Sequence, residues 1–195
     1  MATTEKKMNA LQLLAADHRE VEGLFEQFEK AKGAERKQKL VRRICTELKV
    51  HAQIEEEIYY PAVRGKVEDA DLDEAYVEHD GAKLLINELE SAEPDEAFYD
   101  AKVKVLQEQI EHHVKEEERQ HDSLFSQTRK ADVDLDAMGE RLLARKQELM
   151  AMAADGGLPP AEPKTFEGGE LSDGGAPEFG EVGAREGEKP GAAAR

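Results

Sequence analysis

The sequence contains one cysteine and no tryptophan, and aromatic residues make up only 5 % of it. A single cysteine cannot form a disulfide within the chain, so nothing indicates an oxidising compartment. No apolar run approaches the roughly 20 residues that cross a bilayer. The first residues, MATTEKKMNALQLL, also lack the apolar stretch of a signal peptide. We therefore expect a cytoplasmic protein without a membrane segment.

Basic side chains are scarce: 27 Lys and Arg stand against 44 Asp and Glu, which gives a formal net charge of −17. Proteins that bind phosphate backbones need clustered Lys and Arg, so we expect no nucleic-acid partner. The same acidity is compatible with binding cations. The composition leaves the oligomeric state open, a monomer included.

Glycine and proline are rare before Ala154 and abundant after it. Residues 156–195 hold 10 of the 15 glycines and 5 of the 7 prolines. This segment has too few large apolar side chains to offset the entropy cost of ordering it. We therefore expect a domain over residues 1–153 and a disordered acidic tail over 154–195. A passive, solubilising tail is the favoured interpretation, and a functional tail is the alternative.

The domain has the pattern of amphipathic helices, because strong helix formers dominate it and apolar residues recur at steps of three and four. Asn9 is a candidate N-cap for the first helix. The pattern predicts helices over residues 9–33, 34–60 and 69–94, a fourth that starts near Asp95, and a short fifth over 135–152. Four long helices with short connections predict an all-α fold, an antiparallel up-down four-helix bundle with a C-terminal fifth helix.

Histidines interrupt the apolar stripes of all four long helices. The four are His18, His51, His79 and His113, one in each helix. Two carboxylates, Glu55 and Glu117, follow a stripe histidine by four residues, which places each pair on one helix face about 6 Å apart along the axis. The histidines also stand at similar distances from the connections at Gly33 and Pro94, so all six side chains are expected in one layer.

A histidine on an apolar stripe is, taken singly, more often a core residue than a ligand. A carboxylate that faces a core, however, is costly unless it is paired or binds a cation. The combination of four histidines and two carboxylates at one level therefore predicts a metal site. Imidazole and carboxylate suit iron, manganese or zinc, and the lack of core cysteines argues against structural zinc. Two bridging carboxylates and four histidines can hold a dinuclear centre with open positions.

Four stretches resemble the haemerythrin-like (HHE cation-binding) domain family: LLAADHREVEGLFEQF at 13–28, HAQIEEEIYYPAV at 51–63, VEHDGAKLLINEL at 77–89 and HHVKEEE at 112–118. The resemblance covers about residues 9–150. It implies a four-helix bundle around two non-haem iron ions. On matching positions it implies the ligands His18, His51, Glu55, His79, His113 and Glu117, with the two glutamates bridging.

The family is linked to the handling of dioxygen, peroxide, nitric oxide or iron. The resemblance therefore implies a redox or oxidative-stress protein that reacts with one of these small molecules. The alternative is an iron store or sensor without catalysis. Whether the chain is a peroxide-reactive enzyme stays open at this point.

Two departures from oxygen-carrying haemerythrins concern the third and fourth helices. Those proteins have a paired HxxxH on the third helix, where Ala75 and Lys83 flank His79 here, and a longer spacing to an aspartate where this chain has HxxxE. We therefore expect chemistry rather than reversible oxygen carriage. Lys83 is expected to extend to solvent, with a hydrogen bond to a bound small ligand as the alternative. Many members of the family end the fourth helix with a Phe-Pro pair shortly after the acidic run. Here Phe125 comes later and is followed by Ser126, so the fourth helix is expected to run on longer.

Several other polar residues receive a weaker assignment. Glu56 is expected to point about 100° away from Glu55. The tyrosines Tyr59, Tyr60 and Tyr76 are read mainly as packing residues, each able to donate a hydrogen bond to the site, and Cys45 as a small buried core residue. Three further residues are kept only as possible additional ligands: Glu22, His112 and His121.

Overall fold

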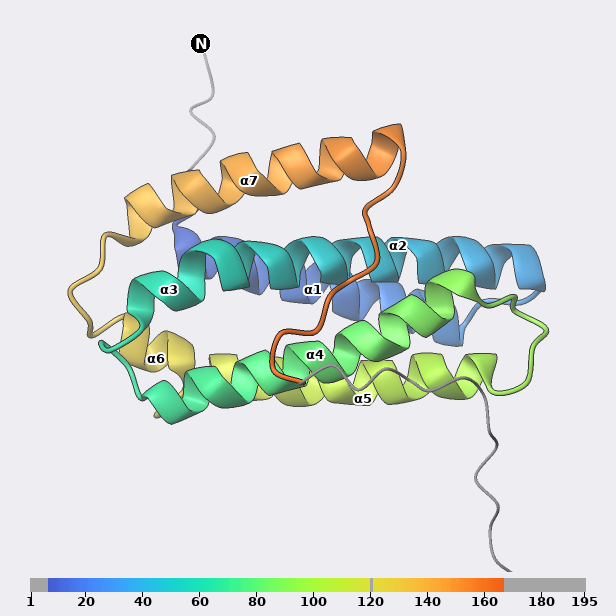
Figure 1. Ribbon diagram of the computed structural model, residues 1–195, viewed down its shortest axis with the longest axis horizontal. Helices are drawn as coiled ribbons and strands as arrows, with labels where there is room; N and C mark the ends of the chain where they lie inside the picture. Colours follow the sequence, from blue (N-terminus) through green and yellow to red (C-terminus); the bar gives the residue numbers. More distant parts are fainter. Residues whose placement is uncertain (1–6, 120, 167–195) are drawn as a thin grey trace, which may run out of the picture.

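Four long helices form an antiparallel bundle in the computed structural model, which describes residues 7–119 and 121–166 (Figure 1). They are α1 (Ala10–Glu29), α2 (Ala34–Ile54), α4 (Asp69–Ser91) and α5 (Tyr99–Glu118). A π-helical turn, η1 (Glu55–Tyr59), and the short α3 (Tyr60–Val63) continue α2. The chain then adds α6 (Leu124–Thr128) and α7 (Leu135–Asp155). The described residues contain no strand, and the predicted all-α bundle with a C-terminal helix is confirmed.

The start of α1 is fixed by a capping box. The Asn9 side chain accepts a hydrogen bond from the Gln12 N–H at 3.0 Å, and the Gln12 side chain accepts one from the Asn9 N–H at 3.1 Å. Two of the unpaired N–H groups of the first turn are thereby satisfied. Gly33 makes the turn into α2 with a positive φ of 86°, a conformation that glycine adopts without strain. The predicted N-cap at Asn9 is confirmed.

The ends of the second and fourth helices differ from the expectation. The helix does not stop at Pro61 but widens into η1 just before it and continues to Val63. Proline has no N–H to donate to the carbonyl four residues earlier, so a regular α-turn cannot be completed there. The fourth helix does not run on longer: it ends at Glu118, and Phe125 lies in the separate α6.

Two apolar clusters fill the bundle, one toward each end. The first joins residues such as Leu14, Ile54 and Leu72 with side chains of α6 and α7. The second is built from α1, α2, α4 and α5 and includes Phe25 and Leu106. The second cluster also holds Cys45, as predicted; burial raises the pKa of its thiol to about 12, so it stays protonated. Along each long helix, the predicted inward histidine falls between the two clusters.

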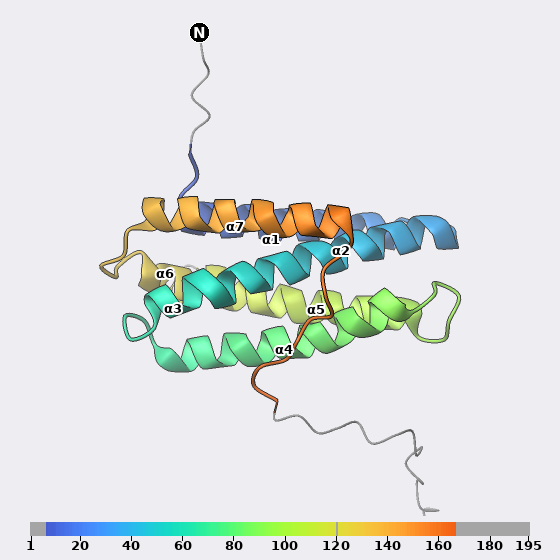
Figure 2. The ribbon, with the colours of Figure 1, turned by 45° about the horizontal axis from the view of Figure 1, so that its top comes forward.

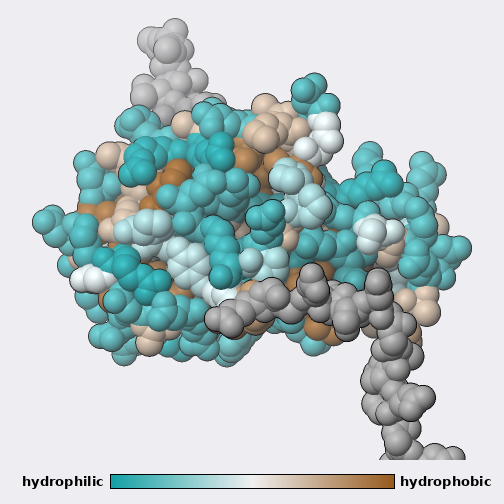
Figure 3. Space-filling view, viewed as in Figure 1, coloured by the Kyte–Doolittle hydropathy of each residue, from teal (hydrophilic) through white to brown (hydrophobic). Residues whose placement is uncertain are grey.

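Helix α7 covers the groove between α1 and α2, and the chain then turns back across the bundle (Figures 1 and 2). We call residues 156–166 the strap. It lies within the predicted tail, yet it is hydrogen-bonded to α2 and α4, and the rest of that tail, 167–195, lies outside the described residues. The face in Figure 3 is mostly hydrophilic, with several separate apolar areas among the polar side chains. None of the helices described has both the length and the apolar character that crossing a bilayer requires.

Gly139 lies where α7 crosses the start of α1. A Cβ added there would stand 2.8 Å from three backbone atoms of residues 8–10, which cannot yield without moving a helix. We expect Gly139→Ala to destabilise the protein by about 1–3 kcal/mol, the usual cost of overpacking, as measured by urea unfolding. Gly23→Ala is the matched control, because nothing lies within 4 Å of its Cβ position. That control should stabilise helix α1 by about 0.5–1 kcal/mol. Equal stability of both variants would contradict the close crossing.

Candidate metal centre

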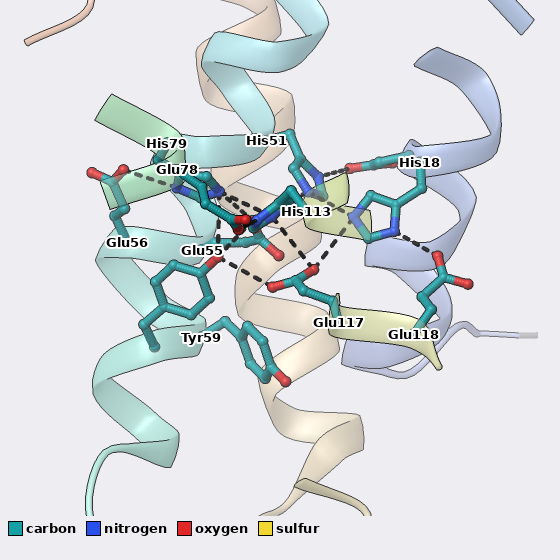
Figure 4. A network of polar contacts seen from close by, with 12 residues as sticks. His18, His51, Glu55, Glu56, Tyr59, Glu78, His79, His113, Glu117 and Glu118 are labelled. Atoms are coloured by element: carbon teal, nitrogen blue, oxygen red, sulfur yellow. Dashed lines mark hydrogen bonds and ion pairs between the residues drawn. The ribbon is translucent and has the colours of Figure 1, made fainter. Parts of the chain in front are cut away.

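All six predicted ligand side chains meet in one buried layer of the bundle (Figure 4). Each is at most 6 % exposed, although all six are polar. The π-turn η1 lies at this layer and contains Glu55 and Glu56, both of which are buried. Such single π-turns occur frequently at functional sites. The convergence that the sequence predicts is therefore present.

The histidines form two pairs across the layer. His18 Nε2 lies 3.0 Å from His51 Nε2, and His79 Nε2 lies 3.3 Å from His113 Nε2. When two imidazole nitrogens bind the same ion at about 2.1 Å, with a nitrogen–metal–nitrogen angle near 90°, the two nitrogens lie about 3 Å apart. The spacing within each pair thus suits one metal ion per pair.

The two glutamates lie between the pairs and contact one histidine of each. Glu55 Oε2 is 3.1 Å from His51 Nε2 and 3.4 Å from His79 Nε2. Glu117 Oε2 is 3.5 Å from His18 Nε2 and 3.8 Å from His113 Nε2. Both carboxylates are therefore placed where they can bridge two ions.

Every histidine of the layer turns its other ring nitrogen, Nδ1, toward an outer carboxylate. The distances are 2.6 Å for His18–Glu118, 3.6 Å for His51–Asp17, 3.0 Å for His79–Glu56 and 2.8 Å for His113–Glu78. A carboxylate at Nδ1 favours the proton on that nitrogen, which leaves the Nε2 lone pair free to bind a metal. We call these four residues the outer carboxylates.

The outer carboxylates were missed as site residues by the sequence reasoning. Glu56 is a correction: it does not point away from the site but is buried and contacts His79. The signal was nevertheless present, because each of the four is the direct neighbour of a candidate ligand in the sequence, as in the pairs 17–18, 55–56, 78–79 and 117–118. Periodicity alone cannot find them, since it assigns neighbouring residues to different faces.

The charges of the layer are strongly coupled. Burial and the nearby negative charge of Glu55 raise the pKa of Glu117 to about 8. Burial alone would lower the pKa of His51, but Glu55 and Asp17 raise it to about 10. Burial lowers the pKa of His18 to about 4, against the pull of Glu118. With a pKa of about 8, Glu117 holds a proton at neutral pH, and a cation between the two buried glutamates would favour the ionised form of both.

Unpartnered atoms show that the layer fits metal ions. Among the described residues, neither Glu55 Oε1 nor Glu117 Oε2 has a hydrogen-bond partner, although both are fully buried. A buried carboxylate oxygen without a partner is costly. The nitrogen and oxygen donors of the layer are those that iron, manganese and zinc accept. The donor set therefore matches one or more such cations.

Tyr60 joins the layer, whereas the other tyrosines do not. Its hydroxyl lies 3.1 Å from Glu117 Oε1 and 3.3 Å from His79 Nε2. Tyr59 instead pairs with Thr128 at 2.9 Å, and the Tyr76 ring packs edge-on against Tyr60.

The remaining candidates lie outside the layer. Glu22 pairs with Arg19 at 2.9 Å, and both His112 and His121 are exposed. The expectation for Lys83 was wrong: it is buried and ion-paired, 2.8 Å from both Glu56 and Asp80. Neither solvent nor the inner ligand atoms are its partners.

The fold and the site define a helical-bundle protein with a buried histidine–glutamate centre for cations. The family model described as "Hemerythrin HHE cation binding domain" matches residues 9–120. The chain belongs to this family, and the predicted resemblance is confirmed.

Two known proteins are similar to this chain. A crystal structure of a hemerythrin HHE cation binding domain-containing protein from Mycobacterium kansasii superposes with a TM-score of 0.65 at 24 % identity, covering 77 % of this chain and 95 % of that one. A protein named "DNA nickase" from Nostoc sp. is 28 % identical over 114 residues, 58 % of this chain. The chain spans only about a third of that relative, 32 % of its length.

The outer carboxylates should control metal affinity without holding the fold together. We expect Glu78→Gln to weaken metal binding about 10- to 100-fold, because a neutral amide orients the His113 ring less firmly. Titration of the metal-free protein with Fe²⁺ under anaerobic conditions measures this. The control is Glu88→Gln, an exposed carboxylate of α4 that belongs to none of the candidate metal groups of the described residues. Unchanged affinity in Glu78→Gln would show that the outer carboxylate has no such role.

Proposed function

We propose that the chain is a non-haem di-iron protein that reacts with dioxygen, peroxide or nitric oxide. His18 and His51 would hold one iron and His79 and His113 the other, with Glu55 and Glu117 as bridges. One observation carries this proposal: the four histidines form two pairs, and both glutamates lie between the pairs. The Nε2 atoms within the pairs are 3.0 Å and 3.3 Å apart, and each glutamate contacts one histidine of each pair. One ion alone would leave one histidine pair without a partner.

Two adjacent irons would supply redox equivalents and open coordination positions to a small ligand. The protein contributes the surroundings. Apolar clusters on both sides of the layer restrict water, and the outer carboxylates hold the imidazole rings in position. The Tyr60 hydroxyl, beside Glu117 and His79, is placed to donate a hydrogen bond within the layer.

The alternative is an iron store or sensor without catalysis. It uses the same ligands, so metal content alone does not separate the two functions, and reactivity does. We propose no nucleic-acid partner, because a chain with a net charge of −17 is repelled by phosphates. The nickase activity in the relative's name is not carried over, since two thirds of that protein have no counterpart here.

The metal content is the first test. We expect two irons per chain after expression in iron-replete medium, measured by elemental analysis. His51→Ala should bind less iron and melt at a lower temperature than the iron-loaded parent, because metal that binds only the folded state stabilises it. His121→Ala is the matched control, since that histidine is exposed and lies outside the layer. One iron per chain, or zinc alone, would contradict the di-iron proposal.

Reactivity is the second test. With four histidines and no HxxxH on α4, we expect the reduced protein to autoxidise in air and the oxidised protein to react with hydrogen peroxide. Stopped-flow absorbance follows both reactions. An absorbance spectrum that cycles reversibly when oxygen is removed and returned would instead indicate an oxygen carrier. Two tightly bound irons that respond to neither oxidant would favour the store or sensor.

A further inference from the structure

The strap encloses a cavity that reaches the metal-binding layer. After α7 the chain crosses α2 and α4 in both ribbon views (Figures 1 and 2). Between strap and bundle lies a cavity of about 360 Å³, and all four histidines of the layer contribute to its lining. A volume of this size is typical of small-molecule sites and far exceeds the needs of dioxygen or nitric oxide.

The strap is fixed at both ends of the cavity by polar contacts. Near its start, the Leu158 carbonyl accepts a hydrogen bond from Lys49 Nζ at 3.3 Å. In its middle, the Ala161 backbone exchanges two hydrogen bonds with the Asn87 side chain, at 2.8 Å and 2.9 Å. Toward its end, Asp80 Oδ2 accepts the Lys164 N–H at 2.7 Å. These contacts give the cavity a defined outer wall.

The walls of the cavity are mainly apolar. The apolar part of the bundle side includes Leu48, Ala52, Ala82, Ile86, Ile110 and Val114. The strap contributes the apolar run from Leu158 to Ala161, with two prolines between, and the charged Glu162 and Lys164 beyond it. Such walls bind through removal of apolar surface from water.

The lysines at the cavity already have carboxylate partners. Lys49 pairs with Glu90 at 2.9 Å, and both Lys83 and Lys164 pair with Glu56 at 2.8 Å. An anionic ligand would have to compete with these ion pairs and would face the acidic side chains that also line the cavity. The lining therefore favours a neutral ligand.

We propose that this cavity binds a neutral small organic molecule with an apolar body, its polar end directed toward the histidine layer. The proposal deepens the proposed function by giving the centre an organic ligand class in addition to the small oxidants. Only the chemistry at the irons rests on that proposed function, because binding needs the cavity alone. The strap lies outside residues 9–120, so the outer wall of the cavity belongs to the part of the chain that the family model does not match, whereas the bundle side lies within the matched range.

The strap also connects the cavity to the ligand geometry. Lys164 Nζ contacts Glu56 Oε2 at 2.8 Å, and the other oxygen of that carboxylate contacts His79 Nδ1 at 3.0 Å. Glu56 also lines the cavity, so a ligand held beneath the strap would lie beside the carboxylate that orients His79. Through Lys164 and Glu56, a ligand bound in the cavity can therefore affect the orientation of the His79 ring.

The test uses the neutral fluorescent probe N-phenyl-1-naphthylamine with metal-free full-length protein. We expect one probe to bind per chain with increased fluorescence, and 1-nonanol to displace it. A chain ending at Gly156 should bind the probe about tenfold more weakly or worse, because the apolar wall is lost. A chain ending at Phe166 keeps the strap and serves as the matched control, with unchanged affinity.

A second pair of variants tests the bundle side. Ala82→Phe should fill the cavity and weaken probe binding by a similar factor, whereas Ala101→Phe, at an exposed position of α5, should not. Circular dichroism confirms that each variant is helical. No probe binding by the full chain, or full affinity in the chain ending at Gly156, would overturn the proposal. A chain that binds the probe but not two irons would refute only the di-iron function, and the reverse result would refute only the cavity.

Discussion

The mutual dependence of two buried glutamates and four buried histidines constrains the rest of this structure. Glu55 and Glu117 are almost completely buried and lie between two apolar clusters, where an unbalanced negative charge is very costly. Their balance requires imidazoles and cations from all four long helices at once. A shift of any helix by one turn, about 5.4 Å, would remove one partner from the layer. The layer thus fixes the relative heights of helices whose apolar stripes alone would allow other registers.

Around this layer, each histidine faces an outer carboxylate, and most of these carboxylates face a basic side chain. The outer carboxylates hold the imidazole rings, and three of them are paired in turn with basic side chains: Asp17 with Lys146 at 2.6 Å, Glu118 with Arg19 at 2.7 Å, and Glu56 with Lys83 and Lys164 at 2.8 Å. Lys146 belongs to α7 and Lys164 to the strap. Helix α7 and the strap, which lie outside residues 9–120, therefore help to orient the ligand side chains. The fold is shared with other proteins, but these contacts come from segments beyond the matched domain.

Only a small part of the acidic composition belongs to the metal centre. Two ligand carboxylates and the four outer carboxylates gather there, six of the 44 acidic residues, and cations there would offset part of the net charge of −17. The cavity beneath the strap adjoins this centre on one side. The outer wall of this cavity is built by the strap, whose glycine- and proline-rich composition predicts an unstructured tail. Ion pairs and hydrogen bonds hold that wall in place, together with the packing of Leu158 against the first apolar cluster.

The sequence by itself determined the helices, their order and the layer, because helical periodicity and equal distances from the turns are local properties that a chain carries in its residue order. The inward positions of His18 and Glu117 follow from that rule, and so does the N-cap at Asn9. Only the tertiary structure decided which ring nitrogen faces which carboxylate, because those contacts join residues of different helices. It alone brought Glu56 against His79, buried Lys83 between two acids and laid the strap over the cavity. Each of these depends on contacts between segments far apart in the chain, which no periodicity records.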